Sequence, residues 1–207
     1  MITRITLAIV LATALVRGEI VDRVAIIVNK RVVKDSDIEL DLRVTAFLNQ
    51  TPVSRTPAAR KESAQRLIDQ LFIRDEIARG DSESAPVAEG QRLLTDLKKA
   101  RFNNDIAYQN ALRSHGITED DLKEKLFFQT TVLRFIDMRF KPGVFVTDNE
   151  IKTEYDAHRQ QYRGTLEAAR DAIEDKIAGE RVNKLLFDWL AQRRKEAKII
   201  YREEELR

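Results

Sequence analysis

The sequence contains no cysteine, and this absence excludes several kinds of site. Disulfides, thiolate zinc sites and cysteine nucleophiles all require the thiol, so none of them contributes to this fold. An anchor on an acylated cysteine is excluded for the same reason. A chain of this length buries on the order of 70% of its unfolded surface, so a core can form without cross-links.

Proline, net charge and recognisable catalytic motifs are also scarce. The four prolines fall in expected loops or at helix ends, so they interrupt no helix. Without residues 1–18 the basic and acidic residues are equal at 34 each, which argues against a nucleic-acid partner. The two histidines, His115 and His158, have no partner placed for catalysis, and no nucleotide-binding or metalloprotease motif occurs. We therefore expect no enzymatic activity and no cofactor.

One long hydrophobic run is present, and it lies at the N-terminus. Residues 5–16 are apolar or small, follow a single positive charge at Arg4 and end at Arg17-Gly18. The run is about twelve residues long, whereas a spanning helix needs about 20, so the pattern predicts a signal peptide over residues 1–18 and export to the periplasm. The alternative is an uncleaved segment that anchors the protein.

The stretch 20–39 combines several local signals. Residues 24–28 are apolar on both faces, which predicts a buried strand over residues 23–28. Asn29-Lys30 supplies a two-residue turn because Asn tolerates positive φ, and residues 31–33 run back as a second strand. Ser36 and Glu39 have the spacing of a capping box, which predicts the start of a helix.

The rest of the chain follows helical periodicity with start and stop signals at most ends. Thr56-Pro57, Asn104, Thr118 with Asp121, and Thr147 with Glu150 are expected helix starts, while Gly80 and Gly116 are expected stops. The fold class predicted is therefore mainly α, with helices over residues 57–80, 87–100, 105–115, 118–140, 147–155 and 166–198.

The last apolar residues, 198–201, read as a short closing strand after the long helix. A strand of this length is unstable alone, so we expect it to pair beside the N-terminal hairpin. The first and last parts of the chain would then form one folding unit. The alternative is a frayed, charged tail, because the sequence REEELR follows.

Several motifs occur in an order that resembles a known family. The opening VDRVAIIVN is followed by LIDQLFIRDEIAR, HGITEDDLKEKL, VFVTDNEIKTEYDAHRQQY and a final LEAARDAIEDKIAGERVNKLLFDWLAQRRKEAKIIY. Together they resemble the extracytoplasmic chaperones of the SurA/PpiD/PrsA type. The resemblance implies a multi-helix chaperone core over residues 19–207, built from an N-terminal part (19–162) and a C-terminal helix and strand (166–207) that close on it.

The chain departs from that family at one place. SurA-like proteins usually carry parvulin prolyl-isomerase domains before the C-terminal helix, but here only Arg163-Gly164-Thr165 stand between the two segments. We therefore expect no parvulin domain and no prolyl isomerase activity. The function that the resemblance implies is ATP-independent holding of unfolded outer-membrane or secreted polypeptides in the periplasm.

Candidate client-binding residues come from the wide apolar arc of one helix. Phe127 and Phe128 are adjacent, so they cannot share one narrow stripe. We expect Phe128, Phe135 and Met138 to contribute to a client-facing surface, with burial in the core as the alternative. Two other functions stay open: a homodimeric scaffold formed by exchange of the C-terminal helix, and an accessory subunit that binds a folded partner.

Overall fold

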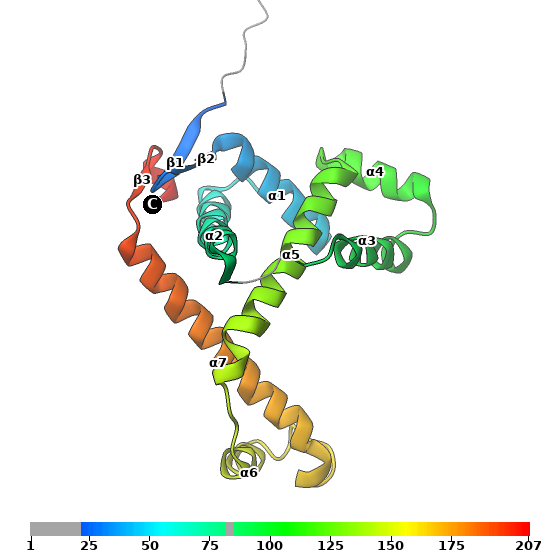
Figure 1. The fold of residues 1–207 in the computed structure, drawn as a ribbon. Coiled ribbons are helices and arrows are strands. Elements are labelled where there is room, and N and C mark those ends of the chain that lie inside the picture. Colours follow the sequence, from blue (N-terminus) through cyan, green and yellow to red (C-terminus); the bar gives the residue numbers. More distant parts are fainter. Residues whose placement is uncertain (1–21, 82–84) are drawn as a thin grey trace, which may run out of the picture.

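The computed structural model describes residues 22–81 and 85–207, and these residues form a mainly helical protein with one small sheet (Figure 1). The predicted signal segment at residues 1–18 lies outside the described residues. Among the described helices, none is long and apolar enough to cross a membrane. The elements in chain order are β1 (Val24–Val28), β2 (Arg31–Lys34), α1 (Asp35–Asn49), α2 (Pro57–Glu76), α3 (Val87–Arg101), α4 (Asp105–His115), α5 (Glu119–Arg139), α6 (Asp148–Ala157), α7 (Leu166–Glu196) and β3 (Ile199–Tyr201).

The three strands form an antiparallel sheet in the order β2-β1-β3, which confirms that the C-terminal strand pairs with the N-terminal hairpin. Ile27 of β1 lies opposite Ile200 of β3. Asn29 turns the hairpin with a positive φ of 53°, as predicted. It also ties the C-terminal segment down, since its backbone N–H donates to the Lys198 carbonyl and its side-chain oxygen accepts from the Lys198 N–H, both at 2.9 Å.

The predicted capping box of Ser36 and Glu39 is wrong, because β2 leads directly into α1 at Asp35. Ser36 therefore already lies in the first turn of the helix, and its hydroxyl donates to Asp22. The side chain that caps is Asp37, which accepts a hydrogen bond of 2.8 Å from the Lys34 N–H. The predicted helix start lies two residues from the observed one, but the side chain that caps the helix is Asp37 and not Glu39.

The other predicted helix starts are confirmed. At five of these N-termini a side-chain oxygen accepts a hydrogen bond from the backbone N–H three residues further on, which satisfies one of the free donors of the first turn, whereas α3 begins after Pro86 without a side-chain cap. At Thr118 and Thr147 the acidic residue at the third helical position also bonds back to the cap, which completes a capping box. The residues that cap in this way are Thr56, Asn104, Thr118, Thr147 and Thr165.

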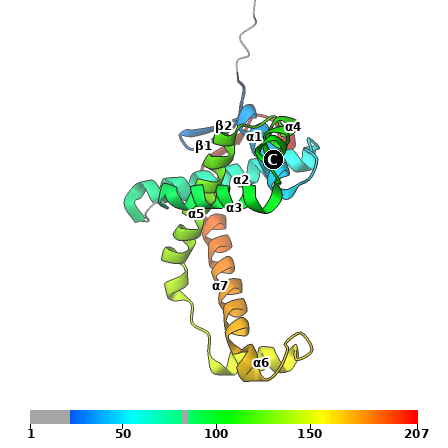
Figure 2. The ribbon, with the colours of Figure 1, turned by 90° about the vertical axis from the view of Figure 1, so that its right-hand side faces the viewer.

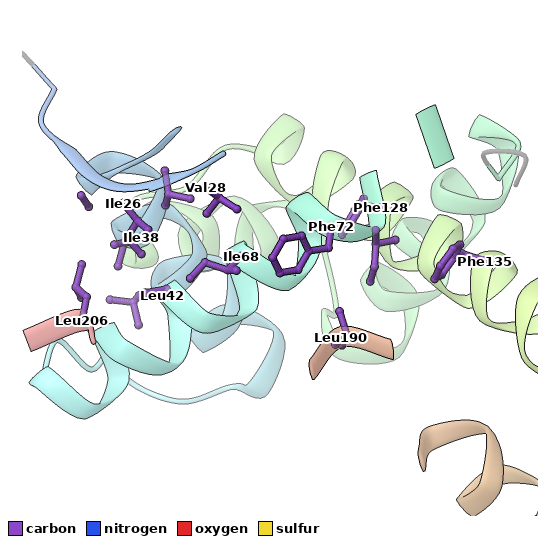
Figure 3. Packing of buried hydrophobic residues seen from close by; sticks show 14 of the residues in the cluster. Ile26, Val28, Ile38, Leu42, Ile68, Phe72, Phe128, Phe135, Leu190 and Leu206 are labelled. Carbon is purple, nitrogen blue, oxygen red and sulfur yellow. The ribbon is translucent and has the colours of Figure 1, made fainter. Parts of the chain in front are cut away.

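The buried side chains gather in three clusters. The largest lies between the sheet, α1, α2, α5 and α7, and it includes Leu206 beside the C-terminus (Figure 3). A second cluster joins α1 to α3, α4 and α5, and a third joins α6 to the first half of α7. Figures 1 and 2 show the consequence for shape: the end of α5 and most of α7 extend from the body as an arm, with α6 at its tip.

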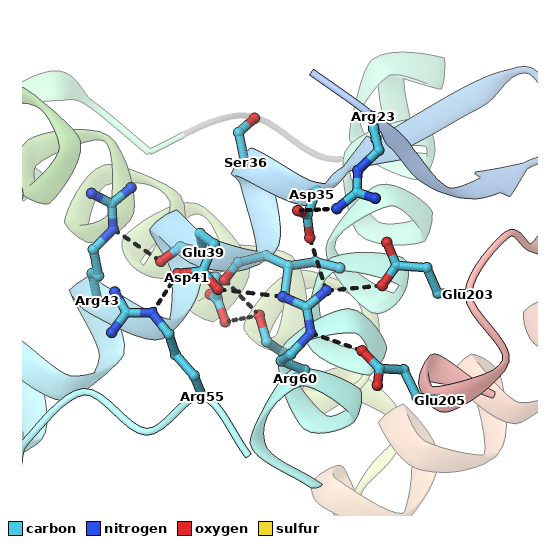
Figure 4. A network of polar contacts seen from close by, with 12 residues as sticks. Arg23, Asp35, Ser36, Glu39, Asp41, Arg43, Arg55, Arg60, Glu203 and Glu205 are labelled. Atoms are coloured by element: carbon cyan, nitrogen blue, oxygen red, sulfur yellow. Dashed lines mark hydrogen bonds and ion pairs between the residues drawn. The ribbon is translucent and has the colours of Figure 1, made fainter. Parts of the chain in front are cut away.

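Arg60 of α2 fastens the C-terminal segment to the body (Figure 4). Its guanidinium meets Asp35 at 2.8 Å, Glu39 at 3.3 Å, Glu203 at 2.9 Å and Glu205 at 3.2 Å. The hydrogen bond to Asp35, together with that to Glu203, raises the pKa of Arg60 above its ordinary value although partial burial opposes this. The first helix and the last residues of the chain therefore share one cation.

Candidate functional site

A groove opens to solvent between β2, α1, α2 and α5, and it has a volume of about 300 Å³. Four elements meet here, because β2 and α1 are joined directly while α2 and the more distant α5 pack beside α1. The side chains that line the groove are Val32, Val33, Asp37, Leu40, Asp41, Val44, Leu67, Gln70, Leu71, Arg74, Asp121, Glu124, Lys125 and Phe128.

The walls of this groove are apolar and its rim is charged. Val32 of β2 is 47% exposed, which leaves a branched apolar side chain in contact with water on the edge strand of the sheet. Leu40 and Leu71 line the walls from α1 and α2. The Arg74 guanidinium lies 4.1 Å from the centre of the Phe128 ring, a cation–π contact that places a charge over an apolar surface.

Asp41 is the buried charge of the groove, and its side chain is only 3% exposed. Lys125 of α5 donates to one carboxylate oxygen at 2.7 Å. Arg66 and Ser63 of α2 donate to the other oxygen, at 2.7 Å and 2.9 Å. One carboxylate on α1 thus links α2 and α5, the two helices that form the opposite walls.

The ionisation of Asp41 is determined by these partners. Burial by itself raises the pKa of this carboxyl, but the charges and hydrogen bonds of Lys125 and Arg66 outweigh burial. The net effect lowers the pKa below its ordinary value. Asp41 is therefore a structural anion that holds the walls of the groove together.

The structure corrects two of the three residues predicted to face clients. Phe135 is fully buried, and Phe128 lines the groove but is only 6% exposed. Both belong to the largest core cluster. Met138 is 52% exposed, as a client-facing residue must be. The expectation failed for the two phenylalanines because a helical arc wide enough to suggest exposure is here covered on two sides.

Phe135 is the centre of the junction between the body and the arm. Its ring lies 5.8 Å from that of Phe140 and 5.3 Å from that of Trp189 on α7. Beside these rings the buried carboxylate of Glu76 pairs with three arginines, at 3.1 Å, 3.1 Å and 3.2 Å. Aromatic packing and ion pairs therefore fix α7 to α2 and α5 at this point.

Sequence reasoning missed the residues that make the groove open. The sequence pattern places Val32 only in a return strand, and no signal separates Leu40 from the core residues of α1. Leu71 is adjacent to Phe72, and such an apolar pair is a signal of a wide apolar arc, as Phe127-Phe128 is on α5. In the structure Phe72 is buried, whereas Leu71 lines the groove.

The arrangement supports binding by shape and charge. His115 packs edge-on against Phe47, and His158 lies 3.1 Å from Glu154 within its own helix. In the part of the chain that the structure describes, no group of three or more His, Cys, Asp or Glu side chains is placed to hold a metal ion. The groove offers an apolar surface for one or two side chains, with charged groups of both signs around it.

Comparison with known proteins identifies no relative: no family model matches the chain, and no curated protein matches its sequence. The resemblance to the SurA-type chaperones therefore stays a prediction that rests on the order of the motifs.

Proposed function

We propose that this protein is an ATP-independent chaperone that holds unfolded polypeptides in the periplasm. The observation that carries the proposal is the open groove, in which an apolar wall of the exposed Val32 and the half-buried Leu40 and Leu71 is bordered by acidic and basic side chains. An unfolded segment needs a place for its apolar side chains and polar groups around it, without a fixed recognition geometry. The groove meets these requirements.

Two further features support the proposal. The arm that ends in α6 leaves large apolar side chains in solvent, among them Leu133, Met138 and Phe145. The order of the sequence motifs resembles exported chaperones, and the apolar run before Arg17 has the length of a signal peptide. Outer-membrane and secreted proteins are the clients that this proposal names.

The test is the aggregation of an unfolded client. A urea-unfolded outer-membrane β-barrel is diluted into buffer with an equimolar amount of the purified protein, without nucleotide, and light scattering is followed. We expect scattering to be suppressed, and we expect no acceleration of cis/trans exchange in a proline peptide. Unchanged scattering for several unrelated clients would sink the proposal, and isomerase activity would overturn its non-enzymatic part.

A matched pair of variants tests the groove itself. Val32 and Val24 are both exposed valines of the hairpin, but only Val32 lines the groove. Val32→Asp and Val24→Asp make the same chemical change on neighbouring strands, and because its cost depends on the strand, thermal unfolding of both variants is measured first. When both stay folded, a difference in suppression reports the groove. We expect Val32→Asp to lose most of the suppression and Val24→Asp to retain it. Equal activity of the two variants would place client binding elsewhere.

A second candidate function is a homodimeric scaffold that uses α7. This helix has 31 residues, of which Ala169, Ile173, Val182 and Leu190 are buried. Phe187 and Leu185 of the same helix are exposed, which leaves apolar area for a second copy. Mass measurement by light scattering after size exclusion, read beside the aggregation assay, separates the two functions: a dimer that Phe187→Ser converts to a monomer, in a protein that suppresses no aggregation, would favour the scaffold.

A further inference from the structure

Two adjoining hollows lie where the loop after α1 meets α4, and they share no lining residue with the groove. The first has a volume of about 450 Å³ and a mainly apolar lining. The second has a volume of about 530 Å³ and a lining rich in arginine. Pro52 and His115 line both hollows, so whatever fills one lies next to whatever fills the other.

The first hollow is lined by aromatic side chains. The rings of Phe47 and Phe102 are stacked with centres 6.1 Å apart, and the His115 ring stands at 89° to Phe47 with centres 5.5 Å apart. The orientation of His115 is set by contacts with the carbonyl oxygens of Ala111, at 2.9 Å, and Thr51. Aromatic surfaces in such an arrangement favour an incoming ring, which gains stacked and edge contacts.

The second hollow is basic. Arg43, Arg55 and Arg113 line it, and no acidic side chain does. Within residues 22–81 and 85–207, Arg55 is the one of the three that pairs with a carboxylate, that of Glu39. Arg43 instead donates to the carbonyl oxygens of Glu39 and Gly116, and Arg113 donates to a side-chain amide. Two guanidinium groups therefore retain capacity for an anion.

Arg101 adds a further positive charge at the first hollow. It donates to the Leu48 carbonyl at 2.6 Å and takes part in no ion pair within the described part of the chain. The groove between α1 and α5, in contrast, is lined by more carboxylates than basic groups. Guanidinium groups bind carboxylates through paired, charge-assisted hydrogen bonds, so the ligand that complements the two hollows is aromatic and anionic.

We propose that the two hollows form one binding site for an unfolded segment in which an aromatic side chain lies next to Asp or Glu. The aromatic ring enters the hollow beside Phe47 and Phe102, and the neighbouring carboxylate binds Arg43 and Arg113. This inference rests on the proposed holding function and gives it a sequence preference. A nucleic-acid strand also offers rings and negative charge, but the near-zero net charge of the chain argues against one.

The test is fluorescence anisotropy with short labelled peptides and the purified protein at low ionic strength. The probe is Gly-Ser-Phe-Asp-Ser-Gly with an amidated end, and the comparison peptides replace Phe with Ala or Asp with Asn. We expect the Phe-Asp peptide to bind about tenfold more tightly than either comparison peptide. Arg113→Gln should weaken its binding about threefold, because Arg113 is exposed and screened by water.

Arg92→Gln is the matched control, since Arg92 is an exposed arginine on α3 that lines neither hollow. Its binding should equal that of the unmodified protein, and thermal unfolding should be the same for both variants. Equal affinity for Asp and Asn peptides, or equal effects of the two arginine substitutions, would overturn the inference. Tighter binding of a peptide that ends in Phe with a free carboxylate, or displacement by a single-stranded oligonucleotide, would also overturn it.

Failure of this inference differs from failure of the proposed function. Suppressed aggregation without discrimination among the peptides overturns the aromatic-acidic site and leaves the holding function in place. Discrimination that Arg113→Gln reduces, in a protein that suppresses no aggregation, supports the site and overturns the holding function.

Discussion

Removal of the Asp41 charge is the most direct test of how the groove is held open. Asp41→Asn keeps the size of the side chain but leaves Lys125 and Arg66 without the carboxylate that they share. Removing one partner of a buried ion pair costs about 3–5 kcal/mol, because the remaining charge stays desolvated. Arg66 is 38% exposed and recovers water, so we expect a loss of about 2–3 kcal/mol in the free energy of unfolding.

Urea unfolding followed by circular dichroism measures this loss, and a slope equal to that of the unmodified protein shows that the variant exposes the same amount of surface on unfolding. Asp120→Asn is the control. Asp120 is 91% exposed and, among the residues that the structure describes, pairs with Lys123 of its own helix alone, so its loss should cost less than about 0.5 kcal/mol. The double variant Asp41→Asn, Lys125→Met should recover part of the stability, because it also removes the stranded ammonium group.

The pH dependence supplies the refutation. The pKa of Asp41 is lower in the folded protein than the value of about 3.9 in an unfolded chain, so its contribution to stability is complete above that pH. It is lost as the pH falls through the folded-state pKa. The difference between the unmodified protein and Asp41→Asn should therefore be full near neutral pH and shrink below about pH 4. A gap below about 1 kcal/mol at neutral pH, or one that acid leaves unchanged, would refute this reasoning.

The remaining predictions concern packing and titration. A Cβ at Gly90 would lie 3.0 Å from the α5 backbone, so Gly90→Ala should cost about 1–3 kcal/mol in urea unfolding. Gly179→Ala, where the added Cβ meets open space, should raise the free energy of unfolding by about 0.4–1 kcal/mol. If Gly90→Ala is stabilising as well, α3 and α5 do not approach each other closely at Gly90. Phe135→Ala should cost about 3–5 kcal/mol, because it leaves a cavity in a fully buried site. Met138→Ala should change the free energy of unfolding by less than about 0.5 kcal/mol while it weakens client holding. If Met138→Ala and Phe135→Ala lose equal stability, the assignment of Phe135 to the core and of Met138 to the surface is wrong. NMR titration should give Glu150 a pKa of about 2, because backbone and side-chain hydrogen bonds at the α6 N-cap lower it; a midpoint near 4.5 would contradict that cap.

Local elements were predictable because their causes are local. The positive φ of Asn29 and the capping box of Thr118 and Asp121 each involve residues within a few positions of one another. The capping box at Ser36 and Glu39 was wrong for a related reason. The same short stretch contains Asp37, and which acidic residue caps depends on where β2 ends, which its pairing with β1 determines.

The candidate site was much less predictable, because a helical pattern does not tell which elements cover a given face. Phe128 and Phe135 lie on an apolar arc that fits either a core or a client surface, and the packing of α2 and α7 decides for the core. Val32 belongs to a strand whose apolar pattern suggests burial, yet side chains alternate along β2, so Val33 is buried in the core and Val32, on the other face, is half exposed. The arginine-lined hollow joins residues from α1, the following loop and α4, and no sequence spacing indicates that meeting.

By itself, the sequence determined the mainly α class, most helix boundaries, the hairpin and the need of the last strand for a partner. These properties follow from turn residues, capping residues and hydrophobic periodicity, each of which acts over one or two turns of the chain. Only the tertiary structure decided that Asp41 joins α1 to α2 and α5, and that Met138 is exposed while Phe135 is buried. It did so because burial and ion pairing depend on which distant surfaces meet, and these contacts are properties of the assembled helices rather than of any one segment.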